Sequence, residues 1–176
     1  MAPSSSIPWF LLSVLILMLK QYPLARGDEA LIGNVCNKTL APEFCINCLN
    51  STPEGQQQDI RGFGGKSINC TQDQAHVVQH LLSILVANTT AKDVNEAYAK
   101  CLEMYEVIGQ MLPIAFDSWS KTNYSDSAVQ VRAVVDTHYK CVDLIVGFSN
   151  PPELDHELYK FRCLSTAAID VINQIH

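Results

Sequence analysis

Apolar residues recur every three or four positions over most of the chain, which is the period of an amphipathic helix. Four stretches show this period: 59–87, 94–119, 125–147 and 154–175. No stretch of the sequence alternates apolar and polar residues as a half-buried strand does. Since the links between these stretches are short, we predict an all-α fold, an antiparallel up-down-up-down four-helix bundle.

The first half of the stretch 59–87 is rich in glycine. Gly62, Gly64 and Gly65 each cost about 1 kcal/mol relative to alanine in a helix interior. We therefore expect this end of the helix to be bent or frayed.

An apolar run of eleven residues, Trp9–Leu19, precedes the helical region. The run is short for a membrane span but suits the hydrophobic core of a signal peptide. Because Ala25 and Gly27 are the small residues that a signal peptidase needs at its subsites, we expect cleavage after Gly27. We predict a signal peptide at 1–27 and a mature chain at 28–176. That chain has ten basic and eighteen acidic residues, a net charge of −8. This charge argues against nucleic acid and suits a basic protein partner, and we expect no membrane association after cleavage.

Sequons and cysteines both indicate the secretory pathway. The sequence has more N-x-Ser/Thr sequons than chance predicts, and all seven cysteines lie in the mature chain, where oxidising conditions favour disulfides. The candidate glycosylation sites are Asn37, Asn50, Asn69, Asn88 and Asn123. An odd number of cysteines leaves at least one thiol free or paired between chains.

The predicted bundle topology allows possible cysteine pairs to be compared by their heights along the bundle axis. At about 1.5 Å of rise per residue, Cys101 and Cys141 lie within about 3 Å of the same height on neighbouring helices, so we predict a disulfide between them. We also predict a disulfide between Cys36 and Cys45, which closes a short loop. Cys48 and Cys70 form a possible third pair, whereas Cys163 differs from Cys70 in height by on the order of 10–15 Å and is the expected free thiol.

Residues that could carry chemistry do not assemble a catalytic centre. His76 and His80 have a spacing that can bind zinc, but no third ligand follows from the sequence, and we expect a solvated helix face. Cys45 and Cys48 have redox spacing without the βαβ pattern that accompanies it, so a structural role is favoured. We predict a protein that is not an enzyme and that uses no metal or cofactor.

The sequence resembles the plant invertase and pectin methylesterase inhibitor family over essentially the whole mature chain. The similar segments are "VCNKTLAPEFCINCLN", "AYAKCLEMYEVIGQML", "THYKCVDLI" and "FRCLSTAAIDVINQI". The resemblance implies a disulfide-closed N-terminal helical hairpin, assigned here to 28–56, and a four-helix bundle at 57–176. It also implies that Cys36–Cys45 and Cys101–Cys141 are the family's two disulfides.

The resemblance further implies a secreted inhibitor of a cell-wall enzyme. The link "SKTNYSDSA" lacks the Pro-Lys-Phe motif of the invertase inhibitors, so pectin methylesterase is the expected target, blocked by steric cover of its substrate cleft. Inhibition of a cell-wall or vacuolar invertase is the alternative, and the expected location is the cell wall or, alternatively, the vacuole. Candidate contact residues on the second and third bundle helices and their link are Glu96, Glu103, Glu106, Gln110, Tyr124 and Asp126.

Two other functions are open at this point. A secreted helical bundle could enclose a lumen and carry a small ligand, in which case a large central cavity should be present. An enzyme using the His76 and His80 pair is the other alternative.

Overall fold

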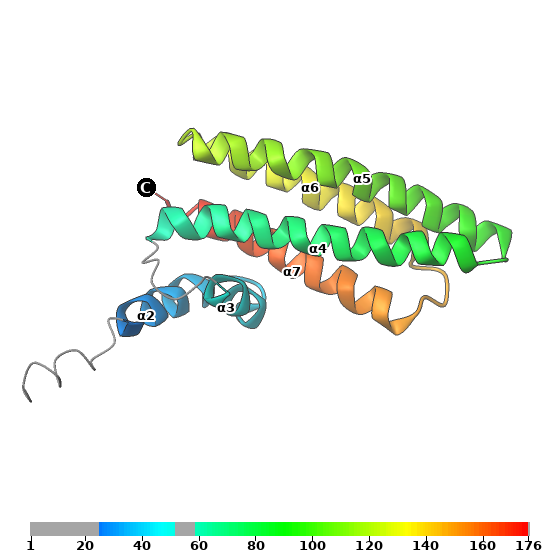
Figure 1. The fold of residues 1–176 in the computed structure, drawn as a ribbon, viewed down its shortest axis with the longest axis horizontal. Coiled ribbons are helices and arrows are strands. Elements are labelled where there is room, and N and C mark those ends of the chain that lie inside the picture. Colours follow the sequence, from blue (N-terminus) through cyan, green and yellow to red (C-terminus); the bar gives the residue numbers. More distant parts are fainter. Residues whose placement is uncertain (1–24, 52–58, 176) are drawn as a thin grey trace, which may run out of the picture.

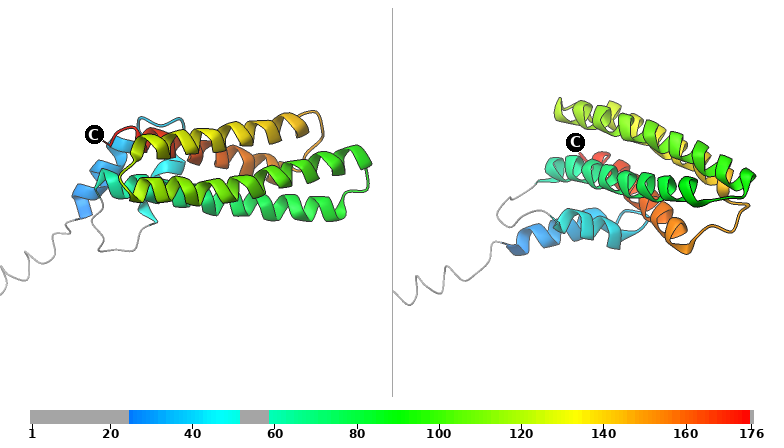
Figure 2. Two further views of the ribbon diagram at one scale, coloured as in Figure 1. Left: turned by 90° about the horizontal axis from the view of Figure 1, so that it is seen from above. Right: turned by 45° about the vertical axis from the view of Figure 1, so that its right-hand side comes forward.

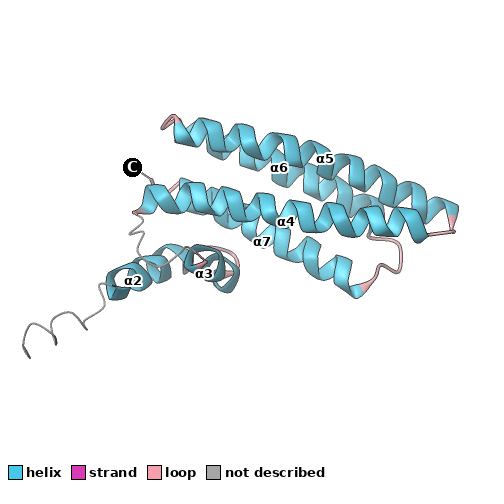
Figure 3. Ribbon diagram, in the orientation of Figure 1, coloured by secondary structure: helices cyan, strands magenta, loops and turns pink. Residues whose placement is uncertain are grey.

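The computed structural model describes residues 25–51 and 59–175, and these residues fold into helices joined by turns and short loops (Figure 3). The prediction of an all-α fold is confirmed. The helices are α2 (Ala25–Cys36), α3 (Pro42–Asn50), α4 (Ile60–Asn88), α5 (Lys92–Ser120), α6 (Tyr124–Ile145) and α7 (Pro152–Ile172). The predicted signal peptide lies outside the described residues except for its last three, which begin α2. None of the described helices is long and apolar enough to cross a membrane.

The four long helices form an antiparallel bundle (Figures 1 and 2). Helices that follow one another in the chain run in opposite directions, and their links alternate between the two ends of the bundle. Helix α4 packs against α5 and α7, and α6 packs against the same two helices, so the four helices enclose one core. The predicted up-down-up-down topology is confirmed.

Aromatic side chains fill the centre of the bundle. Tyr105, Phe161 and His138 are buried and in mutual contact, and the Tyr105 hydroxyl lies 2.7 Å from Nδ1 of His138. Leu82, Ile108 and Leu112 are also fully buried, whereas Leu85 is partly buried against the same core. These side chains occupy the space that a ligand-carrying lumen would need.

The glycine-rich start of α4 does not fray. The helix begins at Ile60 and continues without interruption to Asn88, with Asp59 as its N-cap and the Asp59 side chain accepting a hydrogen bond from the Gly62 amide at 2.9 Å. The expectation of a frayed helix end was wrong because it considered only intrinsic propensity.

A tryptophan from α5 explains the glycines. The indole of Trp119 lies against the backbone of α4, where a Cβ atom at Gly65 would come within 2.6 Å of the ring and one at Gly64 within 2.9 Å. The indole N–H also donates to the Arg61 carbonyl at 3.1 Å. Glycine therefore leaves room for a tertiary contact that offsets its poor helix propensity.

Replacement of Gly65 by alanine should destabilise the protein, although alanine gains about 1 kcal/mol over glycine in an unhindered helix. The added methyl group would displace the Trp119 ring. Trp119→Ala removes the same contact from the other side and should lower the free energy of unfolding by about 2 kcal/mol. This is less than the loss expected for a fully buried tryptophan, because the Trp119 ring is only partly buried. Urea unfolding measures both changes.

The matched control is Gly33→Ala in α2, where an added Cβ would meet nothing within 4 Å. This variant should be neutral or stabilising. If Gly65→Ala is also stabilising, the Trp119 ring does not need the space that Gly65 leaves.

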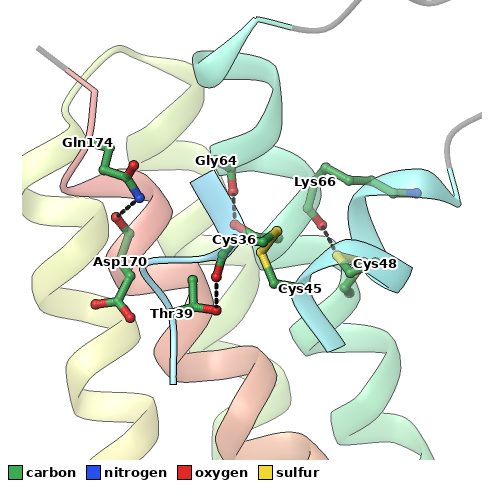
Figure 4. Close-up of a disulfide and its surroundings, with 10 residues drawn as sticks. Cys36, Thr39, Cys45, Cys48, Gly64, Lys66, Asp170 and Gln174 are labelled. Carbon is green, nitrogen blue, oxygen red and sulfur yellow. Dashed lines mark hydrogen bonds between the residues drawn. A yellow bond between two sulfur atoms is a disulfide. The ribbon is translucent and has the colours of Figure 1, made fainter. Parts of the chain in front are cut away.

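The short helices α2 and α3 form a hairpin that lies along α4 and α7 (Figure 1). A disulfide joins Cys36 to Cys45 within the hairpin, with the Cα atoms 5.5 Å apart (Figure 4). A second small core holds the hairpin on the bundle. Its buried members are Ile32, Val35, Cys36, Cys45, Cys48, Leu49, Phe63, Leu164, Ala167 and Val171. The predicted boundary between hairpin and bundle falls outside the described residues.

Two further disulfides connect different helices. Cys48 of α3 pairs with Cys70 of α4, with 6.0 Å between Cα atoms, so the pair that the sequence left open is present and fastens the hairpin to the bundle. Cys101 of α5 pairs with Cys141 of α6, with 4.6 Å between Cα atoms, as the helix heights predict. Cys163 is buried and free.

Removal of the Cys48–Cys70 bridge by the double replacement with alanine should loosen the hairpin more than the bundle. The bridge closes a segment with a sequence separation of 22, and such a cross-link acts mainly by restricting the unfolded ensemble. We expect amide exchange in α2 and α3 to speed up by about tenfold or more. Exchange in α5 and α6 serves as the internal control, and equal acceleration there would show that the hairpin and bundle open together.

Candidate partner-binding face

The outer side of α5 presents one continuous stripe of side chains. Glu96, Glu103 and Gln110 are exposed and seven residues apart, a spacing that returns to almost the same side of a helix. Two further residues of this stripe are apolar: Val107, between Glu103 and Gln110, is 47% exposed, and Ile114, one turn beyond Gln110, is 56% exposed. The stripe therefore combines acidic and apolar groups in solvent.

Glu106 is also exposed on α5 but turns toward α4. It lines a shallow groove of about 370 Å³ between the two helices, together with Leu102 and four residues of α4. Those four are His76, Gln79, His80 and Ser83. Glu106 thus belongs to the edge of the α5 stripe and not to its centre.

Tyr124 and Asp126 lie at the opposite end of the stripe from Glu96, in the first turn of α6. Tyr124 is only partly exposed because its ring packs against the bundle core. Asp126 is exposed and accepts a hydrogen bond from the Asn123 side chain at 2.5 Å. At 1.5 Å per residue, Glu96 and the end of α5 are about 36 Å apart, so the six predicted residues are spread along the bundle and do not cluster.

The link between α5 and α6 is a closed turn of three residues. The amides of Thr122 and Asn123 donate to the carbonyls of Trp119 and Ser118, each at 2.9 Å, and Thr122 adopts a positive φ of 61°. Because these bonds hold the link against the end of α5, it does not project away from the bundle.

Exposed apolar residues were missed at this face. These residues are Val107 and Ile114 on α5 and Val129 on α6, which is 60% exposed. They are exposed to solvent beside the acidic residues. The sequence-based prediction included only exposed polar or aromatic side chains as contact residues. The available signal was that these three residues fall between the core positions of their helices.

The remaining candidate residues lie on α3, on α4 and at the sequons. Cys45 and Cys48 each bond to a different cysteine, so they do not form a redox pair with each other. His76 and His80 are exposed, and no three His, Cys, Asp or Glu residues within 25–51 and 59–175 are arranged to hold a metal ion. The asparagines of the five sequons are all exposed.

His138 is a buried group whose pKa is strongly perturbed. Burial, and secondarily the positive charge of Arg162, lowers the pKa of His138 from 6.5 to about 4. The imidazole is therefore neutral at pH 7 and serves as the hydrogen-bond partner of Tyr105 in the core. Its burial within the bundle gives it a structural role.

A disulfide-braced helical bundle with a long exposed face of mixed character defines a protein-binding domain. The chain belongs to the plant invertase/pectin methylesterase inhibitor family, whose model matches residues 30–169.

Individual relatives agree with this family. The chain is 27% identical over 159 residues to a pectinesterase inhibitor of Actinidia deliciosa, covering 89% of this chain and 84% of the relative. It is 25% identical over 137 residues to pectinesterase inhibitor 1 of Arabidopsis thaliana, covering 76% and 74%.

Solved structures show the same fold. A crystal structure of a pectin methylesterase inhibitor from Arabidopsis thaliana matches with a TM-score of 0.64 and 20% identity, covering 85% of this chain and 98% of that one. A mutant form of a pectin methylesterase inhibitor from Arabidopsis matches with a TM-score of 0.72 and 20% identity, covering 82% and 97%.

Proposed function

We propose that this protein is an inhibitor of pectin methylesterase that covers the enzyme's substrate cleft with the outer face of α5 and the adjoining part of α6. Family membership supports the class, and the relatives named pectinesterase inhibitor support the target. The protein itself performs no reaction in this role.

The mixed stripe on α5 is the observation that carries the proposal. Protein interfaces combine apolar groups with polar groups at their rim, and on α5 the exposed Val107 lies between Glu103 and Gln110 while the exposed Ile114 follows Gln110. An interface of ordinary size covers about 800 Å² on each partner. A rigid helix face of that area excludes a polymer from a cleft without entering a reactive pocket.

The short link between α5 and α6 favours the methylesterase over invertase. A motif that reaches into a sugar-binding site must project from the bundle, and Lys121–Asn123 is instead held against the end of α5 by backbone hydrogen bonds. The acidic stripe suits a target whose surface is basic at the cleft.

We also propose secretion to the cell wall, with the vacuole as the alternative. Three disulfides and the exposure of all five sequon asparagines support passage through an oxidising compartment. Mass spectrometry of the protein from a plant host tests both the cut after Gly27 and the occupancy of each sequon.

A titration of the purified mature protein against the two enzyme classes tests the function. We expect inhibition of pectin methylesterase at a near-stoichiometric ratio and no inhibition of invertase, at mildly acidic and at neutral pH. Inhibition of invertase alone would overturn the proposed target and leave the family assignment intact.

Charge reversal tests the proposed face. Glu96→Lys with Glu103→Lys should weaken inhibition by about tenfold or more, mainly through slower association, because complementary charges steer encounter. The matched control is Asp73→Lys with Glu43→Lys, a double reversal that changes the net charge by the same amount at the hairpin and away from the α5 stripe. Equal losses in both variants would show that net charge, and not this face, controls binding.

A further inference from the structure

Two histidines on α4 share a groove with a carboxylate from α5. His76 and His80 are exposed one helical turn apart, and the groove that they line also contains Glu106. Residues four apart lie on the same side of a helix, so the two imidazoles can approach one ion together. The sequence alone gave the spacing of this pair but not the residues that surround it.

Gln79 determines which nitrogen of His76 carries the proton. Its side-chain Nε2 donates to the Tyr105 carbonyl of α5 at 2.6 Å, an assignment that follows because a carbonyl only accepts. The other end of the amide, Oε1, lies 3.1 Å from Nδ1 of His76. Since Oε1 also only accepts, the neutral ring donates from Nδ1 and keeps a free lone pair on Nε2.

The backbone of α5 leaves room for this arrangement. A Cβ atom at Gly109 would lie 3.1 Å from Nε2 of Gln79, which is tighter than an ordinary contact. Glycine at this position therefore lets the Gln79 side chain reach the Tyr105 carbonyl. The result is a half-buried amide that connects α5 to the imidazole of His76.

We propose that His76 and His80 bind one divalent copper or zinc ion, with Nε2 of His76 as one ligand and water completing the coordination. Imidazole is a preferred ligand of both metals. Metal-binding histidines commonly donate their other ring N–H to a carbonyl or carboxylate, and Gln79 supplies that acceptor here.

The site is a two-histidine chelate. No third His, Cys, Asp or Glu in the described part of the chain joins the pair in a ready-made ligand set, whereas Glu106 lines the same groove and adds a negative charge beside the ion. This site would bind in the free protein, so the proposal does not depend on the proposed inhibition.

Calorimetric titration of the untagged protein with copper(II) chloride and zinc chloride at pH 7 tests the site. We expect one ion per chain. His76→Asn and His80→Asn should each lower the affinity by about tenfold or more, and the exposed His156 of α7 supplies the matched control, His156→Asn. Unchanged binding in the His76 or His80 variant would overturn the proposal.

The role of Gln79 as a positioning residue has a separate readout. Nitrogen-15 NMR of the metal-free protein at neutral pH should show His76 as the Nδ1–H tautomer, and Gln79→Ala should abolish that preference. The same variant should bind the metal about tenfold more weakly. An Nε2–H tautomer at His76 in the unmodified protein, or metal affinity unaffected by Gln79→Ala, would contradict the arrangement.

Discussion

Joint replacement of Cys101 and Cys141 by alanine is expected to lower the free energy of unfolding by about 4 kcal/mol. The bridge joins α5 to α6 with a sequence separation of 40, and the cross-link removes conformational freedom from a loop of that length in the unfolded chain. Both sulfur atoms are fully buried, so their removal also leaves a small void. Urea unfolding at neutral pH measures the change.

The free thiol provides the control for this experiment. Cys163→Ala removes one buried sulfur without removing a cross-link, so it should cost clearly less, about 1 kcal/mol. A double variant that loses no more than the Cys163 variant would show that the bridge does not restrict the unfolded chain. The proposed partner-binding face lies on α5, and we expect its affinity for a partner to fall with the loss of rigidity.

Acidification from pH 7 to pH 4 is expected to remove about 3 kcal/mol of stability through His138 alone. The pKa of this residue is about 4 in the folded protein and near 6.5 in the unfolded chain. Between these values the unfolded chain binds more protons than the folded protein, so acid favours unfolding. The contribution is complete above pH 6.5 and is lost progressively as the pH falls toward 4.

A variant that cannot titrate isolates this effect. His138→Gln keeps a polar partner for the Tyr105 hydroxyl but has no proton equilibrium in this range. Urea unfolding of both proteins at several pH values should show the unmodified protein losing about 3 kcal/mol more than the variant over the window. Parallel stability curves would mean that His138 does not control the acid sensitivity. The proposed cell-wall location, which is mildly acidic, lies within this window.

Only part of the candidate face could be predicted from the sequence. Periodicity placed Glu96, Glu103 and Gln110 on the exterior of one helix, and the structure puts them there. Tyr124 was treated as a contact residue, but its ring packs on the core. Whether a side chain near a helix end is exposed depends on the neighbouring helix, and sequence spacing does not specify that neighbour.

The sequence by itself determined the long helices and their order. The predicted stretches 94–119 and 125–147 agree within two residues with α5 and α6, because the helical period is a local property of the chain. Antiparallel order then sufficed to bring Cys101 and Cys141 to one height. These inferences needed only local geometry and short links.

Other contacts between distant segments were decided by the tertiary structure alone. Glycines that weaken an isolated helix form the contact surface for Trp119. The packing of the hairpin on α4 brings Cys48 to Cys70. Gln79 likewise gained its role only from a carbonyl that lies 26 residues further along the chain. Contacts of this kind depend on the relative position and rotation of two packed helices, and that relation is a property of the whole core.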